Sequence, residues 1–138
     1  MADTVEFELV SPERLLVSAS VEMVVVPGAE GDFGVLPGHA PLISTVRPGV
    51  ISTYEDGRVV SRIFVAGGFA EVTAARCTVL ADEAVELEGA DRAAVEGRLR
   101  AAREEFADAD NDAERAAAEA EIAVAEAFLA AIDGVGRT

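Results

Sequence analysis

Apolar and polar residues alternate with a period of two over the first part of the chain. Val5, Phe7 and Leu9 are separated by glutamates, which predicts a half-buried β-strand, and Val21, Met23 and Val25 repeat the pattern. Further short apolar runs, rich in β-branched residues, follow at Val35–Leu36, Leu42–Val46, Val50–Tyr54, Val59–Val65, Phe69–Val72 and Cys77–Leu80. Turn signals such as Asp56–Gly57 separate them. Many short strands without an intervening helix indicate an antiparallel β-sandwich or barrel.

The period becomes helical after residue 90. Val95, Leu99, Ala102 and Phe106 form one apolar stripe, and Asp91 has the character of an N-cap. Asn111 and Glu114 predict a capping box for a second helix, which ends at Gly134. The expected inner face of this second helix comprises Ala113, Ala117, Ala120, Val124, Phe128 and Ala131. We therefore predict a β-sandwich domain at 1–86, a hinge near Glu86–Gly89, and a helical hairpin at 87–138.

The composition predicts a soluble protein with a strong negative charge. The chain has 138 residues, 51% of them hydrophobic, and a formal net charge of −15 with arginine as its only strong base. A basic surface is required for binding nucleic acid or anionic membranes, so we expect neither, whereas a basic protein partner is compatible. We also expect no signal peptide and no membrane span, and hence a protein made in the cytosol.

The sequence offers no catalytic apparatus. The one cysteine, Cys77, lies in a predicted strand and is expected to be a buried, inert thiol. The one histidine, His39, cannot supply a metal site alone, so we expect its ring to bond to backbone or to serve an interface. Asp108, Asp110, Asp112 and Glu119 imitate an EF-hand, but Ala113 stands where the loop needs glycine. We expect neither a metal nor a cofactor.

Three glycines, Gly28, Gly31 and Gly34, are spaced as in a phosphate-binding loop. Such a loop requires a helix after it, and Pro37 and Pro41 prevent one. We therefore interpret this segment as a pair of tight turns in the sandwich.

The same glycine-rich segment carries a family resemblance. The run from Glu30 to Leu42, EGDFGVLPGHAPL, closely resembles the signature of epsilon subunits of bacterial F-type ATP synthases. Three further pieces occur in the matching order: Val46–Val50, Val65–Val72 and Val79–Asp82. The resemblance is strong over residues 5 to about 85, and the remainder matches as two helices of suitable length.

The resemblance implies a non-catalytic central-stalk subunit that couples the gamma subunit to the c ring. By position, Glu30, Gly31 and Asp32 correspond to the c-ring contact, where carboxylates on a rigid turn can pair with arginine. The gamma-facing positions correspond to Ser11, His39 and Ser44. The implied location is peripheral, on the cytoplasmic face of the bacterial inner membrane, with membrane association only through the complex.

The hairpin departs from the pattern of relatives that inhibit ATP hydrolysis by inserting it beside the beta subunit. Residues 101–133 carry ten acids against Arg103 and Arg115, a net charge of −8, so we expect only weak inhibition. Some relatives bind ATP through an Ile/Leu-Asp-x-x-Arg-Ala motif. Here the nearest segment, Leu87–Ala93, has Glu88 for the aspartate and an extra residue before Arg92, so we expect no nucleotide site. Both a folded and an extended hairpin would use the same helices.

Two readings from other functional classes remain open on the sequence alone. One is a free small-molecule-binding β-sandwich with a regulatory hairpin, and the other is an acidic protein-interaction module.

Overall fold

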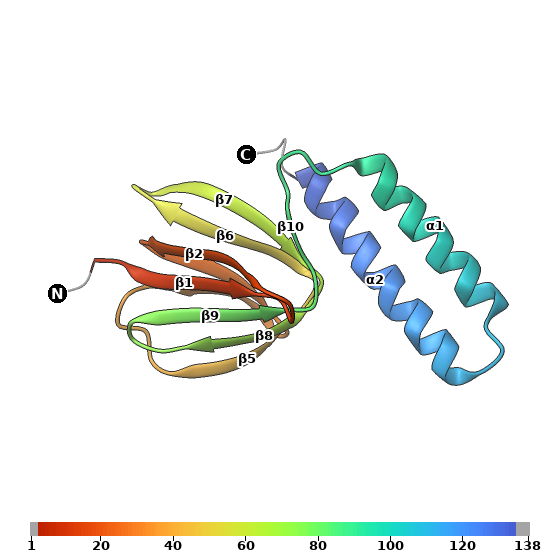
Figure 1. Cartoon of the computed structure of the whole chain (residues 1–138), viewed down its shortest axis with the longest axis horizontal. Helices are drawn as coiled ribbons and strands as arrows, with labels where there is room; N and C mark the ends of the chain where they lie inside the picture. Colours follow the sequence, from red (N-terminus) through yellow and green to blue (C-terminus); the bar gives the residue numbers. More distant parts are fainter. Residues whose placement is uncertain (1–2, 135–138) are drawn as a thin grey trace. The chain divides into compact units, whose positions relative to one another are not determined.

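The computed structural model describes residues 3–134, which form two compact units divided between residues 88 and 89. The boundary follows Glu88, two residues beyond the one expected from the change of period. Figure 1 shows the strands of the first unit and the two helices of the second.

The first unit is built from ten strands within the described residues. They are β1 (Val5–Val10), β2 (Leu15–Val21), β3 (Met23–Gly28), β4 (Gly31–Val35), β5 (Leu42–Val46), β6 (Gly49–Glu55), β7 (Arg58–Val65), β8 (Gly68–Val72), β9 (Arg76–Ala81) and β10 (Ala84–Glu86). Their order is β10-β7-β6-β3-β5-β8-β9-β1-β2, and β4 pairs with β3. Figure 1 shows β1, β9, β8 and β5 side by side in one layer.

The strand order divides into two halves, which are joined by a single residue pair between β3 and β5, Gly28–Val46. Alternate residues of both halves then share one core, which includes Phe7, Val26, Ile51 and Val79. The fold class is confirmed, with one correction: β1 pairs with β9 in parallel, from Glu6–Arg76 to Val10–Leu80, so the sandwich is not wholly antiparallel. Alternation reveals which face of a strand is buried and says nothing about the direction of its neighbour.

Two details of the strand prediction were also wrong. In β3 the buried valines are Val24 and Val26, whereas Met23 and Val25 are only partly buried. The continuous run from Met23 to Val26 is apolar at every position, so its pattern cannot distinguish the two faces. Strand β2, whose Val21 is buried, was not predicted from its pattern either.

The second unit is the predicted pair of helices, α1 (Arg92–Asp108) and α2 (Asp112–Gly134). The Asp91 carboxylate accepts hydrogen bonds from the amides of Ala93 and Ala94, which confirms the first N-cap. At α2 the Asn111 side chain accepts from the Glu114 amide at 2.8 Å, and the Glu114 carboxylate accepts from the amide of Asp110.

The stripe predicted for α1 is confirmed at Val95, Leu99 and Ala102, which are buried, whereas Phe106 is 37% exposed. The inner face predicted for α2 was right in its second half, where Phe128 is buried and Val124 and Ala131 are partly buried. It was wrong in its first half, where the predicted residues are exposed: Ala113, Ala117 and Ala120. The buried residues of α2 are Ala118, Ala125 and Phe128. Alanine occurs on every side of this helix, so the contrast between faces is too weak to fix the rotation.

Candidate functional site

The exposed residues Glu30, Gly31 and Asp32, here called the acidic corner, lie where β3 turns into β4. Gly28 pairs with Gly31 to close the turn, and a side chain at Gly28 would meet the Gly31 carbonyl oxygen at 2.7 Å. The acidic corner therefore requires glycine at position 28. A tight turn between two strands thus accounts for glycines that are spaced as in a phosphate-binding loop.

The acidic corner is fixed to β5 by backbone hydrogen bonds. The amide of Ala29 donates to Thr45 at 2.9 Å, and the amide of Arg47 donates to the Pro27 carbonyl at 2.9 Å. The turn therefore presents its carboxylates from a braced support, as a specific ion-pairing surface requires.

Arg47 was not singled out from the sequence as a site residue, and it contacts the acidic corner directly. Its guanidinium donates to Asp32 at 2.5 Å and also to the carbonyl oxygen of Gly28. The expectation that both carboxylates project freely toward a cationic partner therefore needs refinement. Asp32 is engaged within the chain, and Glu30 makes no ion pair in the part of the chain that the structure describes.

Ser11, His39 and Ser44 are not gathered into one cluster. Ser11 follows the end of β1, and its hydroxyl donates to the Arg14 carbonyl oxygen at 3.4 Å. His39 lies between β4 and β5, beside the backbone bond from Gly38 to Ala74 at the start of β9. Because β1 and β9 run in parallel, Ser11 and His39 are at opposite ends of these strands, which spans roughly 20 Å for six residues.

The local bonding of His39 and Ser44 is simple. His39 Nδ1 lies 2.6 Å from the Ala40 carbonyl oxygen, which confirms the expected bond of the ring to backbone. The Ser44 hydroxyl donates to the Thr45 carbonyl oxygen at 3.0 Å. A partner that contacts Ser11, His39 and Ser44 together would have to extend along the whole of this sheet.

An apolar patch occupies the outward face of β5, β8 and β9, and it was not identified from the sequence. Ile43, Phe69 and Leu80, here called the apolar patch, are 73%, 57% and 55% exposed. Phe69 pairs across the sheet with Leu80, and a shallow depression lined by Ile43, Phe69 and Leu80 lies between these strands. The signal was present in the sequence, because β5 and β9 carry apolar residues at both parities where a solvated face needs polar ones.

Cys77 has the properties expected of an inert thiol. Cys77 is fully buried in β9, and desolvation raises the pKa of its thiol to about 11. At neutral pH the thiol is therefore protonated and unreactive. Within residues 3–134 no three His, Cys, Asp or Glu side chains form a group that could hold a metal ion.

In the hairpin, Arg92 is occupied by carboxylates of its own unit. Its guanidinium donates to both carboxylate oxygens of Asp133, at 2.9 and 3.2 Å, and also pairs with Glu96. The hydrogen bond and charge of Asp133 raise the pKa of Arg92. The same ion pair joins the start of α1 to the end of α2, and a second pair links Arg98 to Glu121 at 2.8 Å. These contacts stabilise the folded form of the hairpin modestly, because the partners are partly exposed.

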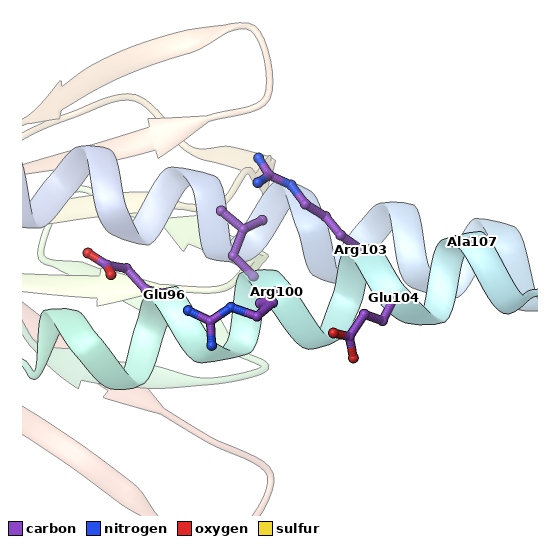
Figure 2. A pocket seen from close by; sticks show the side chains of 6 residues that line it. Glu96, Arg100, Arg103, Glu104 and Ala107 are labelled. Carbon is purple, nitrogen blue, oxygen red and sulfur yellow. The ribbon is translucent and has the colours of Figure 1, made fainter.

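Figure 2 shows a groove on α1, lined by Glu96, Leu99, Arg100, Arg103, Glu104 and Ala107. It contains two acids and two arginines, so it has no excess of charge that would attract phosphate. In the described residues, no helix is long and apolar enough to pass through a bilayer.

The two units match two different family descriptions. Residues 4–87 match the β-sandwich domain of the ATP synthase delta/epsilon chain, and residues 91–138 match the C-terminal domain of the ATP synthase epsilon chain.

Curated relatives agree over nearly the whole chain. An ATP synthase epsilon chain of Rhodospirillum rubrum is 64% identical over 97% of this chain and 100% of its own length. Those of Rhodospirillum centenum and Paramagnetospirillum magneticum are 59% and 54% identical, over 94% and 96% of this chain and 92% and 99% of their own lengths.

Solved structures show the same fold. A chain in the Euglena gracilis mitochondrial ATP synthase complex of OSCP, F1 and c ring superposes with a TM-score of 0.80 at 26% identity, covering 96% of this chain and 83% of that one. A chain of the Tetrahymena thermophila central stalk and c ring gives 0.64 at 16% identity, over 93% and 96% of the two chains, and supports the fold alone. With both domains and close full-length relatives in agreement, the chain belongs to the ATP synthase epsilon chain family.

Proposed function

We propose that this chain is a non-catalytic rotor subunit of a proton-translocating F-type ATP synthase, in which it joins the gamma subunit to the c ring. The observation that carries the proposal is the apolar patch of Ile43, Phe69 and Leu80 on a folded sandwich that belongs to the epsilon family. Clustered large apolar side chains on a soluble domain mark a protein interface, because leaving them in water is unfavourable.

We assign the apolar patch to the gamma subunit. It lies on β5, β8 and β9, between the ends of the sheet where His39 and Ser11 are found, so a partner covering the patch could reach toward both. The related Euglena chain is part of a complex that contains F1 and a c ring, which supports a position in the rotor.

We assign the acidic corner to the c ring. Its carboxylates lie on a turn braced by β5, and they would pair with cationic loops at the membrane end of the rotor. The chain would then be bound peripherally on the cytoplasmic face of the bacterial inner membrane, held there by its partners.

A capture experiment tests this assignment. Immobilised full-length chain should retain purified gamma subunit and assembled c ring, and hydrolysis of ATP by the chain alone should be absent. A monomeric chain that ignores both partners and instead binds a metabolite saturably would favour the small-molecule-binding class.

The hairpin would contact the beta subunit only weakly. Helix α1 carries four arginines and four acids, whereas α2 carries one arginine and six acids, a net charge of −5. Arg92, Arg98 and Arg115 are all paired within the hairpin, which reduces the positive charge available to an acidic loop. Nucleotide binding through Arg92 is disfavoured for the same reason.

Removing residues 89–138 should therefore change ATP hydrolysis little. In the reconstituted enzyme we expect less than about a threefold rise, because a repulsive charge arrangement contributes little affinity for the inserted pose. Steady-state hydrolysis rates of the truncated and complete enzymes measure it. A rise of an order of magnitude or more would contradict the charge argument.

A further inference from the structure

We infer that Arg47 is a positioning residue that holds Asp32 within the chain, so that Glu30 is the carboxylate of the acidic corner that meets the partner's cation. This rests on the proposed contact with the c ring. It assigns different roles to two acids that lie only two positions apart and that are both exposed.

Arg47 ties the acidic corner together through its side chain and its backbone. Its side chain bridges the two strands of the turn, since it donates to the carbonyl oxygen of Gly28 at the end of β3 and to the carboxylate of Asp32 in β4. Its backbone amide donates to Pro27, which adds a third tie to the same turn. One residue of the β5–β6 connection thus contacts both strands that carry the corner.

The two carboxylates of the acidic corner differ in how available they are to a partner. Asp32 is 61% exposed but already satisfies a guanidinium, so an external arginine would have to compete with a partner tethered in place. Glu30 is exposed at the turn and makes no ion pair among the described residues. An incoming cation therefore gains most from Glu30.

The ion pair between Arg47 and Asp32 contributes little to the stability of the whole domain. Arg47 is 42% exposed in this pair, and exposed ion pairs contribute little to global stability. The role of Arg47 is consequently local: it restrains the turn and neutralises Asp32 without holding the sandwich together. A substitution should loosen the turn while leaving the unfolding midpoint nearly unchanged.

One arm of the test uses the isolated full-length chain. The amide of Ala29 donates to Thr45, and Arg47→Gln should speed hydrogen exchange at this amide by roughly tenfold. The reason is that opening of the turn in the variant no longer has to break the charge-assisted hydrogen bond to Asp32. Arg47→Lys, which retains the charge, should recover part of the protection. Unchanged exchange in Arg47→Gln would overturn the inference that Arg47 braces the corner.

The other arm measures affinity of the chain for assembled c ring. Glu30→Gln should weaken binding by about tenfold and Asp32→Asn by less than about threefold, since only the former removes the partner's counter-charge. Asp32→Arg alone should bind poorly, because it places a second guanidinium beside Arg47, and adding Arg47→Asp should restore most of the affinity by re-forming the internal pair in reverse.

The outcomes separate this inference from the proposed function. The inference would be overturned if Glu30→Gln and Asp32→Asn lose equal affinity for the c ring and Asp32→Arg with Arg47→Asp restores none. Asp32 would then itself meet the partner. If neither substitution changes c-ring affinity, Glu30 is not the partner's carboxylate and the proposed c-ring contact fails as well. Faster exchange at Ala29 would then still establish Arg47 as an internal brace.

Discussion

Replacing Gly68 by alanine is expected to destabilise the sandwich more than any other single methyl group added to a glycine of this domain. An added Cβ would lie 1.9 Å from the Leu80 carbonyl oxygen, and the backbone there has a φ of +149°. The strand pair β8–β9 would have to separate, because Gly68 lies opposite Ala81 in its register. We expect a loss of about 3–5 kcal/mol from a free energy of unfolding of roughly 5–15 kcal/mol.

Denaturant unfolding of the full-length chain measures this loss, and Gly34→Ala is the matched control. Gly34 lies in β4 of the same unit, and its added Cβ would meet only the Met23 sulfur at 3.6 Å, an ordinary contact. The control should unfold within about 1 kcal/mol of the parent. Equal stability of Gly68→Ala and Gly34→Ala would show that β8 and β9 do not approach as closely as described.

Substitution of Phe69 by aspartate is expected to abolish most binding to the gamma subunit. Phe69 is the largest side chain of the apolar patch, and an aromatic residue at the centre of an interface commonly contributes about 2–4 kcal/mol, which corresponds to a loss of about 100-fold in affinity. The introduced carboxylate would also be desolvated beneath the partner. Because Phe69 is 57% exposed, the fold should tolerate the change.

Titration of purified gamma subunit against the variant tests this expectation. Val60→Asp is the control, since Val60 is 52% exposed on β7 and lies outside the apolar patch. It should bind gamma as the parent does. A Phe69→Asp chain with undiminished affinity would move the gamma-binding surface to another face of the sandwich.

Much of the fold followed from the sequence because two kinds of local signal are strong. The glutamates between Val5, Phe7 and Leu9 permit only one buried face, and the Asp56–Gly57 turn, with φ values of 54° and 72°, has the conformation that such a pair favours. The caps at Asp91 and Asn111 likewise depend on residues close in sequence.

The errors in the fold prediction arose where the local sequence pattern fits more than one arrangement. The all-apolar run in β3 and the alanine-rich α2 offer no contrast between faces, so their orientation is set by tertiary packing. The parallel pairing of β1 with β9 joins strands about 70 residues apart, and no residue pattern in either strand records its direction.

The contact role of the acidic corner stays a prediction, and its internal chemistry could not be predicted from the sequence. The residues of the acidic corner came from the resemblance, and their exposure agrees with a contact role. The bond between Asp32 and Arg47 crosses 15 positions and depends on how β3, β4 and β5 meet, so sequence alone could not show that one acid is already paired. The apolar patch was overlooked because its members lie on three strands.

Proton-driven ATP synthesis by the reconstituted enzyme carrying Glu30→Lys with Asp32→Lys tests the central claim most directly. Reversing both charges should repel the cationic loops of the c ring and lower synthesis by about tenfold or more, while ATP hydrolysis by the detached catalytic head survives. Glu86→Lys with Glu88→Lys makes the same charge change at two exposed acids that also lie two positions apart, and should leave synthesis nearly intact. Normal coupling in the Glu30 and Asp32 double variant would contradict the assignment of the acidic corner to the rotor.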